Sequence, residues 1–108
     1  MAPSRALLLL SIALAVLPAA AQQRTIPADA KRGFLKHERE ALVSIDGAPA
    51  RLAPGATIRD SHNLIIVPAA MPREGAWADY LLDRGGEVFR VWLLSDEERA
   101  RPRPAARR

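Results

Sequence analysis

The chain of 108 residues contains no cysteine and only two histidines. Without cysteine there is no disulfide framework and no lipid-bearing cysteine of a bacterial lipoprotein. A catalytic zinc site usually takes three protein ligands, and neither His37 nor His62 has a second His or Cys at ligand spacing. The sequence also lacks a Walker sequence and a Gly-x-Gly-x-x-Gly loop, which phosphate or dinucleotide binding would favour. We therefore expect a non-enzymatic protein with no catalytic residue, no metal and no cofactor.

Long apolar runs are also scarce, and the one that stands out lies at the amino terminus. Residues 6–17 follow Arg5 and precede the small-residue sequence Ala19-Ala20-Ala21. The run is shorter than the ~20 residues that a membrane-spanning helix needs, which argues against an N-terminal anchor. Its three-part pattern is typical of a secretory signal peptide, residues 1–21. We expect cleavage after Ala21 and a periplasmic mature chain without a transmembrane segment.

The net charge of +4 arises in the last ten residues. Between Gln22 and Glu98 there are ten basic side chains against twelve acidic ones. Pro102 and Pro104 prevent a basic amphipathic helix, so residues 99–108 are expected to form a disordered basic tail. Such a tail suits weak contact with anionic lipid, and export argues against nucleic acid as a partner. Its cationic residues are Arg99, Arg101, Arg103, Arg107 and Arg108.

A β-hairpin is the clearest element of the sequence. Gly85-Gly86 separates two apolar runs within residues 76–95, and adjacent glycines favour a type I′ turn with two positive φ angles. This turn predicts a hairpin with one wholly apolar face, which we expect to be the core. The predicted cross-strand pairs are Leu82 with Phe89, Tyr80 with Val91, and Ala78 with Leu93.

The other face of the hairpin is the best candidate for an interaction surface. Trp and Arg are the residue types that dominate protein interfaces, and here they alternate along one strand. The alternative is that Trp92 packs under the N-terminal arm or the C-terminal helix as a satellite of the core. The sequence leaves both open. The predicted surface consists of Trp77, Asp79, Arg90, Trp92 and Leu94; Leu81, Asp83 and Val88 are placed on the same face.

The rest of the chain contains short strands separated by turn signals. Residues 22–33 read as a flexible arm, with a short capped turn through Lys31 that ends at Gly33. Residues 34–46 alternate and predict one strand, followed by a turn at residues 46–49. Residues 50–52 and 57–59 predict two further strands, divided by Pro54-Gly55. Residues 64–67 predict a strand buried on both faces that ends at Pro68.

These elements predict one small domain, residues 34–98. Ser95 and Glu98 form a capping box that starts a helix of one or two turns. Several short strands with turns about every ten residues favour an all-β fold, either a small β-barrel or a rolled antiparallel sheet of OB-like or SH3-like kind, with a short C-terminal helix. An open twisted antiparallel sheet with one packed helix is the second choice.

The sequence from Gly55 to Leu94 contains a pattern that is similar to one found in other proteins. The pattern includes Ile58-Arg59-Asp60, Ile65-x-Val67-Pro68 and Arg90-Val91-Trp92. It resembles small uncharacterised exported proteins of betaproteobacteria over about residues 31–98. A looser likeness to β domains of the DUF5666 kind implies a barrel-like architecture. The first resemblance implies a periplasmic location, and neither implies a catalytic or ligand-binding residue.

Two classes of function follow from these residues. The first is a non-catalytic periplasmic module that binds an envelope protein, another envelope component or itself through the outer hairpin face, assisted by the basic tail. The second is a metal-handling or enzymatic protein that uses Asp60, His62 and His37. In the simpler interpretation of this region, Asp60 and Asn63 hydrogen-bond to their own backbone in a turn.

Overall fold

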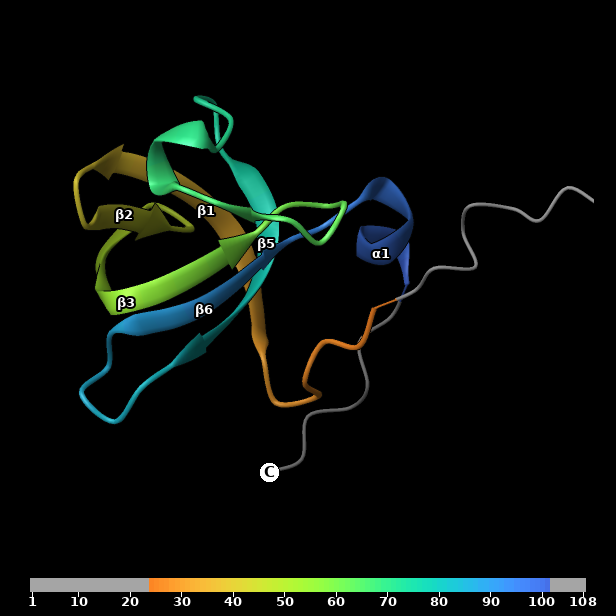
Figure 1. The fold of residues 1–108 in the computed structure, drawn as a ribbon, viewed down its shortest axis with the longest axis horizontal. Helices are drawn as coiled ribbons and strands as arrows, with labels where there is room; N and C mark the ends of the chain where they lie inside the picture. Colours follow the sequence, from red (N-terminus) through yellow and green to blue (C-terminus); the bar gives the residue numbers. More distant parts are fainter. Residues whose placement is uncertain (1–23, 102–108) are drawn as a thin grey trace, which may run out of the picture.

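The structure is a computed structural model, and it describes residues 24–101. The predicted signal peptide and the tail residues Arg103, Arg107 and Arg108 lie outside this range. Six strands form one sheet, with a short 3-10 helix before β5 and a short α-helix at the end, so the small all-β fold with a C-terminal helix is confirmed (Figure 1). No helix within residues 24–101 is long and apolar enough to cross a membrane. The elements are β1 (Lys31–Arg39), β2 (Leu42–Ile45), β3 (Ala48–Arg59), β4 (Ile65–Ile66), η3 (Pro68–Ala70), β5 (Ala76–Leu82), β6 (Val88–Leu93) and α1 (Asp96–Ala100).

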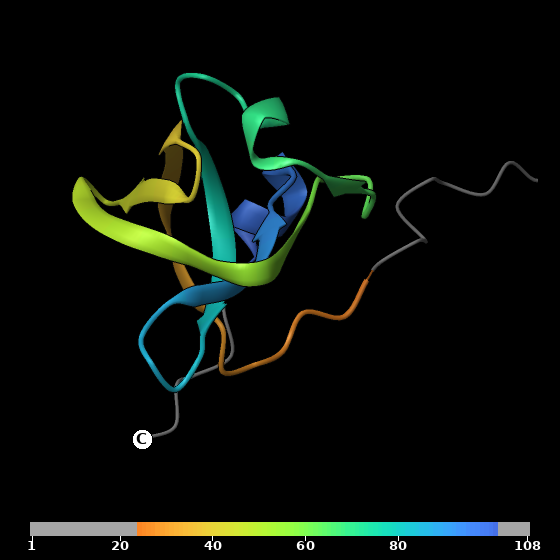
Figure 2. The ribbon, with the colours of Figure 1, turned by 60° about the vertical axis from the view of Figure 1, so that its left-hand side comes forward.

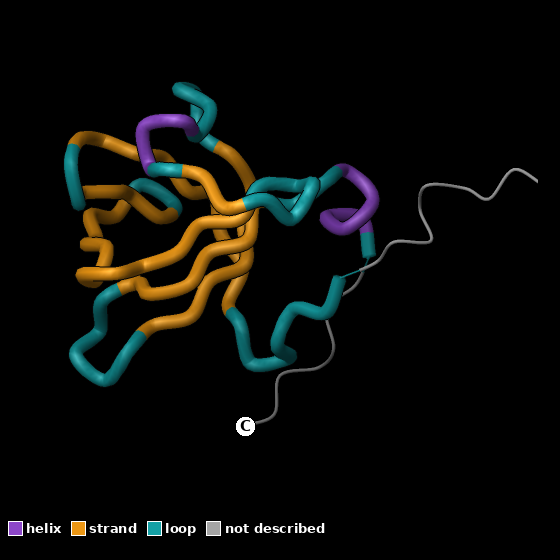
Figure 3. The backbone as a smooth tube through the Cα atoms, in the orientation of Figure 1, coloured by secondary structure: helices purple, strands orange, loops and turns teal. Residues whose placement is uncertain are grey.

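Five of the strands close into a barrel. The order in the sheet is β2-β1-β5-β6-β3-β4, and β2 also pairs with β3, which joins the two ends of the five-stranded part. β4 is left as an outer edge strand. Every pairing is antiparallel except that of β3 with β6, so the sheet is mixed rather than purely antiparallel. This circuit, with a single parallel contact, is of the OB-like kind. Figure 3 shows α1 beyond the ends of the strands.

β3 is one long bent strand rather than two short ones. Its first half pairs with β2, and its second half pairs with β4 and β6. Between the halves, the register against β6 shifts around Pro54-Gly55, where Gly55 has a φ of 79°. The shift leaves the proline without a ladder bond to make, so it is tolerated inside a strand. Figure 2 shows this strand, yellow to green, sweeping across the barrel.

The first strand begins and ends earlier than the sequence predicts. Lys31, Arg32 and Gly33 pair with β5, so the turn expected there is wrong, and β1 begins at Lys31. The alternating stretch that follows forms two strands, β1 and β2, because the chain reverses at Glu40, which has a φ of 51°. The bond from the Leu52 backbone N–H to the Ala41 carbonyl, 2.8 Å long, ties this reversal to β3.

The predicted hairpin of β5 and β6 is confirmed except at its tip. Ala78 pairs with Leu93 and Tyr80 with Val91, but Leu82 pairs with Val88 instead of Phe89. The reason is the turn. Only one of the two glycines, Gly86, has a positive φ, and the Asp83 carboxylate accepts hydrogen bonds from the backbone N–H groups of Gly85 and Glu87, each 2.9 Å long. This longer turn replaces the type I′ turn and moves Val88 from the outer face into the core.

The core is aliphatic and lies inside the barrel. All strands of the closed ring contribute to it, together with one residue before β5. Small aliphatic side chains suit a narrow barrel whose interior must be filled without cavities. Its buried members are Leu35, Val43, Leu52, Ile58, Met71, Ala78, Val88, Val91 and Leu93.

The strand predicted to be buried on both faces is the most exposed one. Only Ile65 and Ile66 pair with β3, and of residues 64–67 only Ile66 packs against the core. Leu64, Ile65 and Val67 are 62%, 61% and 64% exposed. The second half of β3 already has β6 as its other neighbour, so β4 has one partner and no cover. Hydrophobicity predicted the strand correctly but its position wrongly.

Candidate functional site

The cross-strand register aligns a row of side chains on the outside of the barrel. Arg32 on β1 pairs with Asp79 on β5, which pairs with Trp92 on β6. Trp92 pairs with Arg59 on β3, and Arg59 pairs with Ile65 on β4. Directly paired residues project from the same face of a sheet. We call this face, from β1 to β4, the outer wall.

The predicted interaction surface lies on the outer wall but is largely covered. Asp79 and Trp92 share it through their pairing, and the Leu94 backbone N–H donates to the Trp77 carbonyl beside them. However, Asp79 is 4% exposed and Trp92 is 7% exposed, and of the five predicted residues only Arg90 is fully exposed. The alternative of a covered Trp92 is therefore the one observed.

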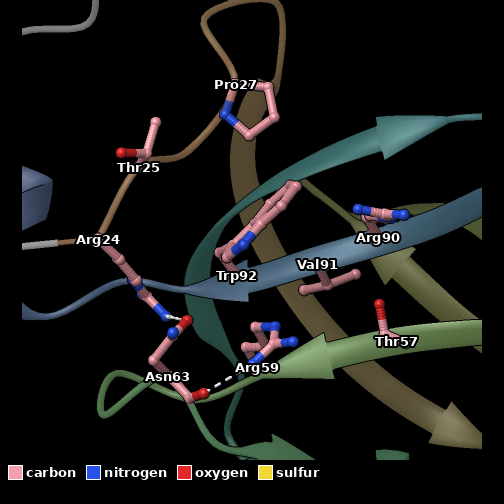
Figure 4. A pocket seen from close by; sticks show the side chains of 9 residues that line it. All are labelled: Arg24, Thr25, Pro27, Thr57, Arg59, Asn63, Arg90, Val91 and Trp92. Carbon is pink, nitrogen blue, oxygen red and sulfur yellow. Dashed lines mark hydrogen bonds between the residues drawn. The ribbon is translucent and has the colours of Figure 1, made fainter.

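The N-terminal arm, residues 24–30, lies over Trp92. Figure 4 shows Pro27 and Thr25 on one side of the indole, with Val91 and Thr57 on the other side. The sequence in the arm has no apolar periodicity that would predict such packing. The arm buries Ala30 and partly buries Ile26 and Pro27, and a polar contact adds to this packing.

Arg24 fastens the arm to the barrel. Its guanidinium donates two hydrogen bonds of 2.9 Å to the Glu98 carboxylate on α1. It also donates to the backbone carbonyls of Leu93 and Asp60, each at 2.6 Å, and weakly to the Asn63 side-chain oxygen at 3.4 Å. The side chains of Arg24 and Glu98 are only 9% and 15% exposed. One arginine thus joins the arm, the end of β6, α1 and the turn before β4.

The other partner in this contact, Glu98, is also fixed by the helix start. The Ser95 hydroxyl accepts from the Glu98 backbone N–H at 3.2 Å, and the Glu98 carboxylate accepts from the Ser95 backbone N–H at 3.0 Å. The predicted capping box is confirmed. Burial raises the pKa of Glu98, but the hydrogen bonds and charge of Arg24 and the hydrogen bonds with Ser95 together bring it below its usual value.

A second arginine, Arg32, fastens the end of α1 and the residue after it. It contacts the Asp79 carboxylate in a two-pronged geometry, at 2.7 and 3.2 Å, and this hydrogen bonding raises the pKa of Arg32. It also donates to the carbonyls of Arg99 and Arg101, each at 3.4 Å. The first residues of the predicted basic tail are therefore tied to the barrel through their backbone.

Trp77 is covered by this same segment. The Arg99 guanidinium lies over the indole at 4.6 Å from the ring centroid, and the Phe34 ring packs edge-on at 5.6 Å. Arg99 thus makes a cation–π contact with the protein itself. Trp77 is therefore half-buried, and Arg99, although exposed, is engaged with the indole.

What remains open is a pocket of about 510 Å³ between the arm and the outer wall. No carboxylate lines it. Arg24 is neutralised by Glu98, but Arg59 and Arg90 form no ion pair with any residue in the range 24–101. Arg59 donates one hydrogen bond, to the Asn63 carbonyl at 2.9 Å, and Arg90 lies 5.7 Å from the Phe89 ring centroid. The lining residues, drawn in Figure 4, are Arg24, Thr25, Pro27, Thr57, Arg59, Asn63, Arg90, Val91 and Trp92.

The pocket brings together residues that are distant in the sequence. Thr57 pairs with Arg90 and Arg59 with Trp92 across the parallel contact of β3 and β6. Arg90 and Trp92 were predicted from the sequence as surface residues, and the arm as an alternative cover for Trp92, but Arg59 and Asn63 were not predicted to join them. A parallel pair needs a long connection, so no local signal in the sequence indicates its register.

The candidate metal ligands Asp60, His62 and His37 do not form one site. Asp60 and His62 belong to the turn before β4, and His37 belongs to the hairpin of β1 and β2. The Asp60 carboxylate accepts from the backbone N–H groups of His62 and Leu64, at 2.9 and 3.0 Å. The hydrogen bond from Leu64, followed by that from His62, lowers the pKa of Asp60. His37 contacts the Glu40 carbonyl at 2.9 Å. Within residues 24–101 no three or more His, Cys, Asp or Glu residues gather where they could hold a metal ion.

In comparisons with known proteins, the chain matches no family model, no curated protein and no solved structure.

Proposed function

We propose that the protein is an exported, non-catalytic binding module of the cell envelope, and that the pocket beneath the arm is its binding site. The observation that carries this proposal is the position of Arg59 and Arg90, two arginines without acidic partners beside the buried face of Trp92. Guanidinium groups are planar and offer paired donors that match carboxylate and phosphate. An anionic group is the ligand that this pocket suits best.

The surroundings of the two arginines favour binding over simple solvation. The arm and α1 are fixed by Arg24, so the pocket wall is held in place before a ligand arrives. Pre-organised donors lose less entropy on binding than free ones. Thr57 adds a hydroxyl beside Arg90. An isolated surface arginine would have neither the wall nor the neighbouring donor.

The export part of the proposal derives from residues 1–21 and has its own test. Cells that express the full chain are fractionated, and the amino terminus of the released protein is sequenced. We expect a periplasmic protein that begins at Gln22. Recovery of an uncleaved chain in the cytoplasm would contradict this location without affecting the pocket.

Binding is tested by a fluorescence titration with inorganic phosphate. The substitution Trp77→Phe leaves Trp92 as the only tryptophan and therefore as the reporter. The protein used begins at Gln22, before all the strands and before Arg24 and Arg32. We expect a saturable change in Trp92 emission, weakened at least about a hundredfold by Arg59→Gln and Arg90→Gln together, since each charge-assisted hydrogen bond contributes about 1.5 kcal/mol or more.

The matched control is Arg84→Gln, because Arg84 is exposed in the hairpin turn and does not line the pocket. Its phosphate response should equal that of the parent. A response that is not saturable, or that falls equally in the control, would refute the pocket as an anion site.

A further inference from the structure

Leu64, Ile65 and Val67 are exposed within one stretch of four residues, and we call these three side chains the apolar ridge. They are the three most exposed large apolar residues of the described chain, each more than 60% exposed. Only one other residue of this kind, Leu82, is 39% exposed, at the tip of the hairpin. Soluble domains leave single apolar residues outside, but three within four positions indicate a contact surface.

The ridge is continuous with the pocket. Ile65 pairs with Arg59, so the two side chains lie on the same outer wall. Val67 has an extended backbone, with φ −84° and ψ 156°, which places it two positions along on the same face as Ile65. Arg90 lies across β3 from the ridge, beside Thr57. Aliphatic side chains and unpaired arginines therefore form one surface.

The acid nearest to this surface in the sequence is already occupied. The Asp60 carboxylate is hydrogen-bonded to the backbone of His62 and Leu64. Glu98 is engaged by Arg24. The backbone hydrogen bonds leave Asp60 ionised, but no carboxylate lines the pocket, so the charge that Arg59 and Arg90 present there is positive.

A partner strand is a poor occupant for the ridge. β4 has two residues in the sheet, and Pro68 follows Val67 without a backbone N–H to donate. Strand addition draws its affinity from a row of backbone hydrogen bonds, which so short an edge does not offer. Side-chain insertion into an apolar medium needs no such row.

We propose that the apolar ridge and the two free arginines dock the protein on an anionic phospholipid surface, with the ridge at the acyl boundary and the lipid phosphates at Arg59 and Arg90. Amphipathic surfaces bind membranes through apolar burial together with attraction to anionic headgroups, and these are the two features that adjoin here. The proposal builds on the anion site proposed above and names its source of phosphate.

The test is flotation with vesicles of phosphatidylcholine, with and without phosphatidylglycerol. The chain begins at Gln22, because the apolar segment before it would itself bind lipid. We expect flotation with the anionic vesicles and little with phosphatidylcholine alone. Replacing Leu64, Ile65 and Val67 together by Ser should reduce partitioning at least about tenfold. Arg59→Gln with Arg90→Gln should reduce it about tenfold, and about 0.5 M salt should act similarly.

Two matched controls distinguish binding through this surface from nonspecific adsorption to vesicles. Leu82→Ser removes an exposed leucine away from the ridge, and Arg84→Gln removes an exposed arginine away from the pocket. Both should float like the parent. Circular dichroism spectra of all variants should coincide, since none of the changed residues belongs to the buried core.

Each failure has a distinct pattern. If phosphate still quenches Trp92 but anionic vesicles do not bind, the docking proposal is refuted and the anion site stands. If vesicles bind but neither phosphate nor the arginine substitutions matter, the anion site fails and docking as stated fails with it. If flotation survives loss of the ridge but not loss of residues 102–108, the tail alone is responsible. If the protein forms a dimer without lipid, and the ridge substitutions dissociate that dimer, the ridge binds a second copy of the chain and the proposal is overturned.

Discussion

At the β1 side of the outer wall Arg32 is paired with Asp79 and Trp92 is covered, whereas at the β4 side Arg59 has no acidic partner and Ile65 is exposed. Both sides carry arginine and large apolar residues, so composition does not explain the difference. The arm and α1 do. Arg32 on β1 fastens the end of α1 over that side, and Arg24 ties the arm to α1, the end of β6 and the turn before β4. β4 itself has no covering segment within residues 24–101. In this small domain the terminal segments determine which half of a mixed surface becomes core.

The largest expected effect is at the covered side. Trp92→Ala should destabilise the domain by about 3–5 kcal/mol, because a large buried side chain leaves a cavity that the strands cannot fill. Urea denaturation measures the loss. Trp77→Ala is the comparison, since Trp77 is only partly buried, and it should cost less. A near-neutral Trp92→Ala would mean that the arm does not form a tight cover.

The next effect concerns the arginine that holds the arm. Arg24→Gln should cost about 2–3 kcal/mol, because Glu98 and two backbone carbonyls lose their donor while still mostly buried. Hydrogen exchange should accelerate in α1 and in the turn at residues 60–63, and not in β1 or β2. Uniform acceleration throughout the barrel would indicate that Arg24 supports the whole fold rather than the cover.

A smaller effect follows from pH. The folded state holds the pKa of Glu98 below its usual value of 4.5, so the stability from ionised Glu98 is complete above that value and is lost as the pH falls through the folded pKa. Thermal midpoints of the wild type and Glu98→Gln, measured from about pH 7 to about pH 3, should converge in the acid range. A gap that stays constant to the lowest pH would show that the charge of Glu98 contributes nothing.

The smallest effect is expected at the open side. Replacing Leu64, Ile65 and Val67 by Ser should change the free energy of unfolding by no more than about 0.5 kcal/mol per substitution, because these side chains remain in water in the folded state. The same denaturation assay checks this. A loss comparable to that of Trp92→Ala would show that the ridge is packed, and the comparison between the two sides would no longer hold.

Local signals in the sequence predicted local structure well. Ser95 and Glu98 specify the capping box within four residues, and alternation fixes the pairs of Ala78 with Leu93 and Tyr80 with Val91. At the hairpin tip the prediction used Gly85-Gly86 and overlooked Asp83, whose side chain selects a longer turn. An aspartate before a glycine pair is a signal that the sequence does contain.

Long-range contacts account for most of what was missed. Arg24 and Glu98 are 74 positions apart, and no pattern in either segment indicates the pairing. Arg59 joins the site only through the parallel register of β3 with β6. Leu64 to Val67 read as a buried strand because hydrophobicity reports preference for an apolar environment, and not how many neighbours the fold has left to provide.

The place of β6 sets an order for folding. It is the last strand within residues 24–101, and it lies between β5 and the second half of β3. During synthesis, which begins at the amino terminus, β1, β2 and β3 can pair early. The barrel stays open until the ribosome has released Leu93, at the end of β6. Until then β3 and β5 both present unpaired edges, which are templates for aggregation. Truncation before β6 should therefore yield insoluble protein rather than a smaller barrel.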